Sequence, residues 1–203
     1  LTGSGKKQTI RLEQPKAQHN WYNDIVVLAF PRPTSDRKIT DYVIKSLGSN
    51  SYPNILMPKP EVVKEQEVVR ISDIQNLTNL MDTEGNLTWQ VPAGEWIVLR
   101  RGHTTTGEKS HPSTAATGGG LEVDKMSRKA LDQYWKDGVQ PILDYLGPLV
   151  GTALTNCLVD SYEVGCGNWT DGFDQEFQRL RGYNPRLYFP AIAGFYVGSS
   201  EQS

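Results

Sequence analysis

Two carboxylates stand three residues apart, Asp160 and Glu163, directly after a short apolar segment over residues 154–159. That segment is too short for a helix and shows no polar alternation, which is typical of a strand buried on both faces. Barrel-type enzymes place acid/base residues at such strand ends. Two like charges also favour keeping one carboxyl protonated near neutral pH, as a general acid requires. The alternative is that Asp160 is only a turn former or helix cap.

Further candidate residues flank this pair. Trp169 offers an aromatic face that packs on a ligand ring, or else fills a local core. Glu122 and Asp124 carry the hard oxygen ligands that calcium prefers, directly after a glycine-rich loop. Their alternative is a helix N-terminus rich in acids, with Asp124 as N-cap and Ser127 in the first turn.

The histidines and cysteines carry less information. His103 and His111 flank a polar loop and offer hydrogen-bonding groups, but their spacing of eight residues has no metal-ligand specificity. The two cysteines make no disulfide framework. We expect Cys157 to be a small buried hydrophobe.

Composition limits the partners. The chain has 203 residues and a net charge of −2, enough length for one large or two small domains. No block of like charges indicates nucleic acid or an anionic membrane surface as a partner. No apolar stretch approaches the roughly 20 residues that cross a bilayer. The first residues do not resemble a signal peptide, and Leu1 in place of Met leads us to expect an excised piece whose remaining parent chain is its partner.

The first half of the chain predicts β structure. Two strands joined by Pro92-Ala93-Gly94 give a compact hairpin signal with an aromatic residue on each arm. Short strands at this spacing indicate a sandwich or jelly-roll-like module. The expected strands cover residues 22–30, 39–47, 67–71, 86–91 and 95–101.

The second half changes character after a polar loop at residues 104–120. Apolar residues from Lys125 onward recur at helical spacing, and Pro141 predicts a kink or two abutting helices that end at Gly147-Pro148. A strand over residues 153–160 and a helix over residues 173–181 follow. The order helix, strand, helix is typical of parallel α/β sheets and barrels.

Several motifs, taken in this order, resemble the α-L-rhamnosidases of glycoside hydrolase family 106. The resemblance is strongest over about residues 91–193. The motifs are Gly102-His103-Thr104-Thr105-Thr106-Gly107, His111-Pro112, Gly120-Leu121-Glu122-Val123-Asp124-Lys125, Asp160-Ser161-Tyr162-Glu163-Val164-Gly165, Asn168-Trp169-Thr170 and Phe177-Gln178-Arg179-Leu180-Arg181-Gly182-Tyr183-Asn184-Pro185.

The resemblance implies an inverting enzyme that removes terminal α-L-rhamnose, with a calcium ion at the sugar site. It assigns the general acid to Glu163, while Asp160 holds substrate or tunes the Glu163 pKa. In an extended chain their carboxyl groups reach up to about 10 Å apart, which includes the roughly 6.5–9.5 Å of inverting glycosidases. The general base is expected further along a complete chain.

The resemblance gives the remaining candidates a ligand. Glu122, with its hard oxygen ligands, is the candidate for the implied calcium ion, and the aromatic face of Trp169 is a candidate platform for the sugar. Tyr162 stands where the family often has Trp, which keeps an aromatic platform. A periplasmic or extracellular bacterial location is also implied. The substrate-binding candidates are Trp169, Tyr162, His103, His111 and Asn168.

The predicted fold is α+β and multidomain. A β-sandwich-like module over residues 1–110 precedes part of a catalytic (β/α)8 (TIM) barrel over residues 111–203. A complete barrel needs about 250 residues, so we expect the isolated chain to be inactive. Two other classes stay open: a non-catalytic carbohydrate-binding module that uses Trp89 and Trp96, and a structural or interaction domain.

Overall fold

A computed structural model describes residues 1–43, 61–109, 120–158, 167–199 and 203. The chain forms two compact units. The first comprises Leu1–Thr105 together with Asp174–Ser203, and the second comprises Thr106–Phe173. Strands and helices are both present, which fits the predicted α+β class. In the part of the chain described, no helix is long and apolar enough to cross a membrane.

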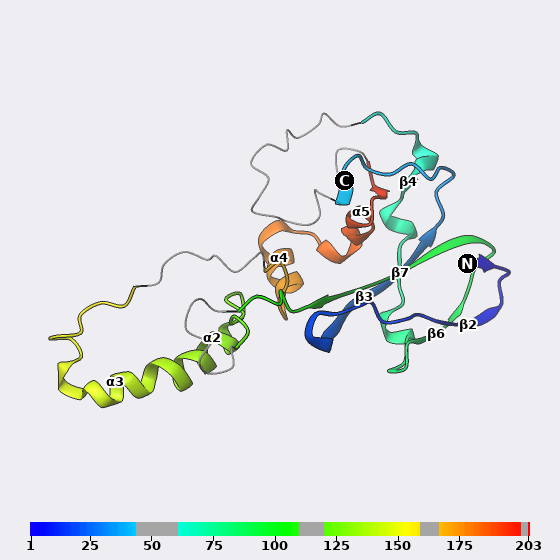
Figure 1. Cartoon of the computed structure of the whole chain (residues 1–203). Helices are drawn as coiled ribbons and strands as arrows, with labels where there is room; N and C mark the ends of the chain where they lie inside the picture. The colour runs from blue at the N-terminus through cyan, green and yellow to red at the C-terminus, as the bar shows by residue number, and fades with distance from the viewer. Residues whose placement is uncertain (44–60, 110–119, 159–166, 200–202) are drawn as a thin grey trace. The chain divides into compact units, whose positions relative to one another are not determined.

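The first unit is built on an antiparallel sheet (Figure 1). Its strand order is β1 (Thr2–Gly3), β7 (Gly94–Thr104), β3 (Tyr22–Pro31) and β5 (Gln75–Asn76). A separate antiparallel pair joins β2 (Lys7–Arg11) to β6 (Asn86–Gln90). A short parallel pair joins β4 (Val68–Val69) to β8 (Tyr196–Val197).

Short helices connect these strands. The 3-10 turns are η1 (Gln18–Asn20), η2 (Glu65–Glu67), η3 (Ile71–Asp73), η4 (Thr78–Leu80) and η7 (Pro185–Tyr188). The α-helices toward the C-terminus are α4 (Phe173–Arg181) and α5 (Phe189–Ile192). Helix α4 confirms the predicted helix over residues 173–181, and Gly182 ends it at φ 81°.

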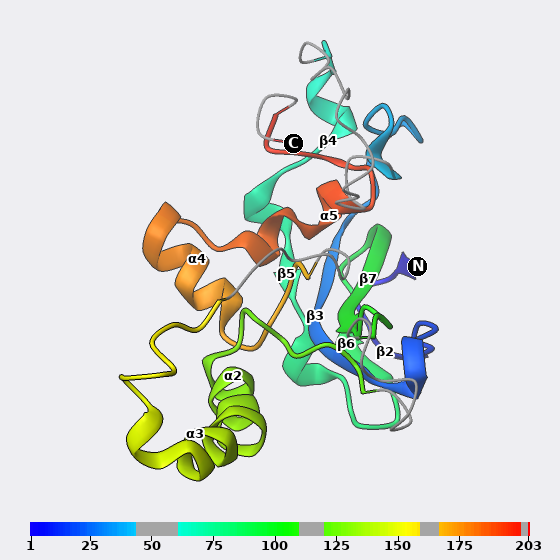
Figure 2. The same ribbon diagram turned by 60° about the vertical axis from the view of Figure 1, so that its left-hand side comes forward.

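Strand β3 is buried on both faces and carries two apolar clusters. Val27 and Ala29 face one cluster, and Phe30 faces the other. The second cluster includes Val197, and Tyr188, Ala191 and Phe195 of the C-terminal segment pack against it. Figure 2 shows the backbone of this segment, with α5, close to β3. Because successive strand residues point to opposite faces, the apolar run over residues 25–30 requires a cover on each side. The last thirty residues therefore complete the core that the first hundred begin.

The predicted strands have mixed outcomes. Strands β3, β6 and β7 confirm the strands expected over 22–30, 86–91 and 95–101. The hairpin expected from the last two is wrong, because in the described sheets β6 pairs with β2 whereas β7 pairs with β1 and β3. The strand expected over 67–71 shrinks to Val68–Val69. The strand expected over 39–47 is wrong for its described part, where Tyr42 and Val43 are helical after a turn. Asp41 adopts φ 56°, which interrupts an extended chain. The β-sandwich stays a prediction.

A largely buried ion pair joins β3 to β7. Arg100 donates through Nε and Nη2 to the two carboxylate oxygens of Asp24, at 2.8 and 2.7 Å, and through Nη1 to the carbonyl of Leu12 at 2.6 Å. Tyr22 also donates to Asp24, at 3.0 Å. Burial and the neighbouring Asp24 carboxylate raise the pKa of Tyr22 to about 12. The Arg100 hydrogen bonds lower the pKa of the Asp24 carboxyl.

Replacing Asp24 by Asn should lower the free energy of unfolding by about 1.5–3 kcal/mol at pH 7, because charge-assisted hydrogen bonds are lost. The pKa of Asp24 is lower in the folded state than in the unfolded state. Its stabilising contribution is therefore present above about pH 4 and lost as the pH falls through the folded-state pKa. Urea unfolding at pH 7 and pH 3 should show the difference between wild type and variant shrinking in acid.

Asp36→Asn is the matched control, because the Asp36 carboxylate pairs with Arg32 on the surface with 86% of its side chain exposed. It should leave the free energy of unfolding unchanged. An Asp24→Asn difference that is equally large at pH 3 would contradict the assigned role of the ion pair.

The second unit contains the predicted interrupted helix. Helix α2 (Arg128–Tyr134) continues through a π-helical turn, η5 (Trp135–Val139), into α3 (Gln140–Leu146) (Figure 1). Pro141 lies in the first turn of α3, where a missing N–H costs least. Gly147 ends α3 at φ 49°, and η6 (Gly147–Leu149) follows. The structure confirms both the predicted break and the predicted end.

The buried strand expected over residues 153–160 is not formed in its described part. Residues 155–158 have no regular structure, and Leu154 makes only an isolated bridge to Val150. Leu158 is 86% exposed, and Cys157 is an exposed free thiol rather than a buried hydrophobe. A parallel strand obtains its hydrogen bonds only from neighbouring strands, and no described strand pairs with this segment. The barrel stays a prediction.

Apolar side chains remain uncovered throughout the second unit. Among its described residues no hydrophobic side chain is buried, and Thr170 is the single buried residue. The uncovered side chains include Leu131, Tyr134, Trp135, Ile142, Tyr145 and Leu149. A helix stripe of this kind normally packs against another layer. The described residues of the unit therefore do not provide a core of their own.

Candidate functional site

The predicted catalytic pair lies outside the described residues. This applies to Asp160 and Glu163, and also to Tyr162 and His111. Their assigned roles therefore stay predictions. The described residues on either side of them can be placed.

The chain that follows the acidic pair is anchored at Thr170. Its hydroxyl donates to Asp124 Oδ2 at 2.7 Å, across 46 residues of sequence. The other carboxylate oxygen of Asp124 accepts from the backbone N–H of Met126 at 3.0 Å. Thr170 is 7% exposed, so this hydrogen bond is shielded from water. It ties the segment before α2 to the segment after Glu163.

This contact corrects the interpretation of Asp124 as a helix cap. Ser127 is the N-cap of α2, and its hydroxyl accepts from the N–H of Ala130 at 3.2 Å. Asp124 lies three residues earlier, where its carboxylate closes the loop to Thr170 instead. The sequence analysis names Thr170 only within the Asn168-Trp169-Thr170 motif and missed its hydrogen bond to Asp124, since residues 46 positions apart give no local signal.

Trp169 packs against Phe173, with ring centroids 5.0 Å apart and planes tilted by 49°. The indole is half-buried, so part of its surface still faces outward, and the neighbouring Asn168 is exposed. This geometry agrees with the local-packing alternative and leaves room for a sugar contact. The substrate roles of both residues stay predictions.

His103 lies on β7 opposite Asn23 and is half-buried. Its ring meets the indole of Trp21 edge to face, with centroids 5.1 Å apart and planes at 89°. Trp21 itself is 46% exposed. The sequence analysis missed Trp21. The available signal was the position of Trp21 directly before β3, since the first residues of β3 pair with the Gly102-His103-Thr104 motif.

The turn before Trp21 is held by Thr104. The Thr104 hydroxyl donates to the carbonyl of Trp21 at 2.7 Å and accepts from the N–H of Gln18 at 2.9 Å. His19 and Asn20 adopt left-handed φ values of 52° and 54°. Non-glycine residues hold such values only where their surroundings demand them. The backbone at Trp21, directly before β3, is therefore held in a fixed conformation.

Glu122 does not form a calcium site with its described neighbours. Its carboxylate pairs with Lys125 Nζ at 3.2 Å, and no group of three or more His, Cys, Asp or Glu side chains with metal-binding geometry occurs in the described ranges. Calcium takes six to eight oxygen ligands. Glu122 alone does not fit that requirement, so no chemical step is assigned to calcium.

Trp89 and Trp96 are core residues rather than sugar platforms. They are 7% and 8% exposed and pack edge to face at 5.1 Å. Trp89 Nε1 donates to Gln75 Oε1 at 3.1 Å, and Trp96 Nε1 donates to the carbonyl of Pro92 at 3.0 Å. Buried indoles with satisfied N–H groups cannot stack on a ligand. The carbohydrate-binding alternative loses the two residues on which it depended.

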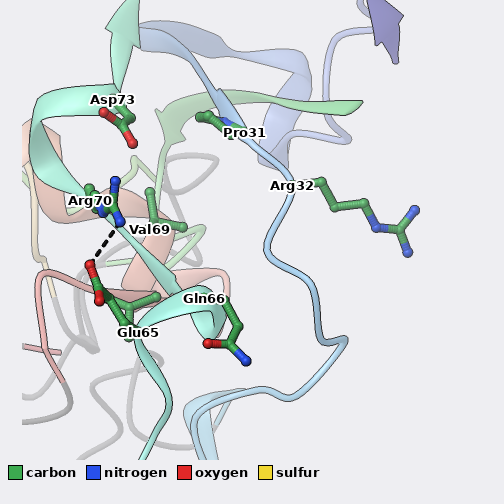
Figure 3. Close-up of a pocket in the computed structure, with 8 residues that line it drawn as sticks. Pro31, Arg32, Glu65, Gln66, Val69, Arg70 and Asp73 are labelled. Carbon is green, nitrogen blue, oxygen red and sulfur yellow. Dashed lines mark hydrogen bonds and ion pairs between the residues drawn. The ribbon is translucent and has the colours of Figure 1, made fainter. Parts of the chain in front are cut away.

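A small open pocket of about 120 Å³ lies beside β4 (Figure 3). Its charged side chains are largely paired, since Glu65 bonds Arg70 at 2.8 Å and Arg32 bonds Asp36 at 2.8 Å. None of the predicted site residues lines it. The pocket therefore does not compete with the site expected around the acidic pair. Its lining residues are Pro31, Arg32, Glu65, Gln66, Val68, Val69, Arg70 and Asp73.

Comparisons with known proteins agree on one family. The family model described as alpha-L-rhamnosidase matches residues 3–203. A protein of Formosa agariphila named "Putative beta-glucuronidase" is 52% identical over 201 residues, which cover 99% of this chain and 17% of that protein. A solved rhamnosidase from Novosphingobium sp. PP1Y matches with a TM-score of 0.61 and 37% identity, over 70% of this chain and 14% of that chain. The chain thus spans about a sixth of the length of its curated relative.

Proposed function

Since this chain belongs to the α-L-rhamnosidase family of glycoside hydrolases, family 106, we propose that it is part of an enzyme that hydrolyses terminal α-L-rhamnose from glycans or glycosides. The observation that carries the proposal is the family match over residues 3–203, supported by the likeness to a solved rhamnosidase. The acidic pair Asp160 and Glu163 lies inside that match.

In the proposed mechanism Glu163 is the general acid. Its carboxyl proton passes to the glycosidic oxygen while the bond from that oxygen to the anomeric carbon breaks. A water molecule, deprotonated by a base elsewhere in the longer protein, attacks the opposite face of the anomeric carbon. The products are an alcohol and rhamnose with inverted configuration. Asp160 keeps Glu163 protonated through like-charge repulsion, or holds the sugar.

The described residues support this arrangement indirectly. The Asp124–Thr170 hydrogen bond anchors the chain seven residues after Glu163 in the sequence. Trp169, directly before Thr170, presents a partly open aromatic face. His103, Asn168 and Trp169 are proposed to contact the sugar. Roles for Tyr162 and His111 rest on the resemblance alone.

The barrel belongs to the same proposal. The uncovered apolar side chains of α2 and α3 are what a barrel helix would pack against its strands. The segment over residues 154–158 would become a strand once neighbouring strands of a longer chain pair with it. Calcium and a location outside the cytoplasm also remain part of the proposal, and both rest on the resemblance.

The name of the Formosa relative favours a second candidate, a β-glucuronidase. The full-length protein should be assayed with an aryl α-L-rhamnoside and an aryl β-D-glucuronide, before and after treatment with a calcium chelator. We expect turnover of the rhamnoside only, with loss of activity on chelation. Turnover of the glucuronide alone would replace the proposed function with the second candidate.

A further inference from the structure

Arg101 carries a positive charge that no described residue neutralises. Its neighbour Arg100 is fully engaged by Asp24 and Leu12. Arg101 points to the opposite face of β7, and within the described residues it makes neither an ion pair nor a side-chain hydrogen bond. Burial lowers the pKa of its guanidinium. A half-buried, unpaired guanidinium is costly to keep and normally indicates a missing anionic partner.

The register of the sheet shows what surrounds Arg101. Arg101 pairs with Val26 and His103 pairs with Asn23, with a bulge between them on β3. Residues 97, 99, 101 and 103 share one face of β7, because side chains alternate along a strand. Ile97 and Leu99 at one end of this face pack into the second apolar cluster. This cluster excludes water from the side of Arg101 that faces Leu99. In the other direction along β7, the same face of the strand continues to His103.

An aromatic platform stands at the other end of the same face. Trp21 meets the His103 ring edge to face and leaves 46% of its own surface exposed. The amide of Asn23 is exposed beside them. Arg101 and His103 lie two residues apart, so their Cα atoms are separated by about 7 Å. The face therefore presents an aromatic plane, an amide and a guanidinium, while the His103 ring, whose Nε2 atom is buried, packs against the aromatic plane.

These groups match the chemistry of an acidic sugar. An indole packs on the apolar face of a pyranose ring, and an amide group bonds its hydroxyls. A guanidinium binds a carboxylate or sulfate through two parallel hydrogen bonds. A neutral sugar would leave the guanidinium without a counter-charge.

We propose that Trp21, Asn23 and Arg101 form a subsite for an anionic sugar unit of the glycan, with its acidic group on Arg101 and its ring against Trp21, which packs on the His103 ring. The proposal rests on the proposed function only in taking the ligand to be a carbohydrate. It adds a recognition site for a second, charged unit, which the rhamnose-cleaving step does not require.

Calorimetric titration of the full-length protein tests the subsite. The protein should carry Glu163→Gln, so that the ligand is not consumed. The probes are α-L-rhamnosyl-(1→4)-D-glucuronate and its neutral counterpart α-L-rhamnosyl-(1→4)-D-glucose. We expect the acidic disaccharide to bind about 10-fold or more tightly than the neutral one, since hydrogen bonds to charged groups contribute about 1.5–3 kcal/mol.

Arg101→Gln should remove that preference and leave binding of the neutral disaccharide unchanged. Arg101→Lys should keep part of the preference, because it retains the charge without the planar fork. Trp21→Ala should weaken binding of both disaccharides. Arg179→Gln is the matched control, since Arg179 is 65% exposed and paired with Glu176 on α4, and it should change neither affinity.

A 6-sulfated form of the neutral disaccharide distinguishes the two acidic groups. Tighter binding of the sulfated ligand than of the glucuronate identifies a sulfated sugar as the ligand, and the reverse identifies a uronate. Equal affinity of wild type for acidic and neutral ligands would overturn the subsite, as would an unchanged preference in Arg101→Gln. Arg101-dependent binding in a protein that cleaves no rhamnoside would retain the subsite and refute the proposed function.

Discussion

Glu163→Gln in the full-length enzyme should lower kcat by about 100- to 10,000-fold on rhamnosides with poor leaving groups. The amide cannot donate a proton to the departing oxygen. On aryl rhamnosides whose leaving group needs little protonation the loss should be much smaller. Steady-state kinetics on an alkyl and a nitrophenyl rhamnoside separate the two cases. Similar rates for the variant and wild type on the alkyl substrate would remove Glu163 from the mechanism.

Asp160→Asn is the informative companion to this variant. Removing a neighbouring negative charge lowers the pKa of Glu163, because a second carboxylate favours the protonated form. The activity that depends on protonated Glu163 should then fall at lower pH, which moves the basic limb of the kcat/KM profile toward acid. A variant that loses activity without moving the profile would show that Asp160 only holds the sugar.

Phe30→Ala should lower the free energy of unfolding by about 3–5 kcal/mol. Phe30 is completely buried, and its ring meets Phe195 edge to face with centroids 5.2 Å apart. The same cluster contains Val69 and Val197. The substitution would open a cavity between β3 and the C-terminal segment. Denaturant unfolding measures the loss, and amide hydrogen exchange should rise over residues 189–197.

Two further substitutions serve as controls for Phe30→Ala. Phe30→Leu keeps most of the apolar volume and should cost less. Leu180→Ala removes a side chain that is 63% exposed on α4 and should change stability by less than about 0.5 kcal/mol. A loss below about 1 kcal/mol for Phe30→Ala would show that the C-terminal segment does not depend on this contact.

Local patterns predicted the parts of the fold whose causes are local. The apolar run over residues 25–30 identified β3, and the aromatic runs on either side of Pro92-Ala93-Gly94 identified β6 and β7, although these two strands pair with other strands rather than with each other. Helical spacing with Pro141 and Gly147 predicted the interrupted helix and its end. In each case the deciding residues lie within a few positions of the element that they define.

Features that depend on distant residues could not be predicted in this way. Trp89 and Trp96 look like ligand platforms until their mutual packing shows them as core. Asp124 has the composition of a helix cap, but its partner Thr170 is 46 residues away. Cys157 lies in an apolar segment that needs neighbouring strands to become buried, and no described strand supplies them. Sequence patterns record what a segment can pack against, not whether the partner is present.

The pairing of β4 with β8 has a consequence for biosynthesis. Val68 and Val69 pair in parallel with Tyr196 and Val197, more than 120 residues later in the sequence. Contacts between residues so far apart raise the contact order and slow folding, since a long loop must close before they contribute. During synthesis on the ribosome, one face of β3 would stay uncovered until residue 197 has left the exit tunnel. Chains cut short before that point should be recognised by chaperones or proteases rather than accumulate as a stable half-protein.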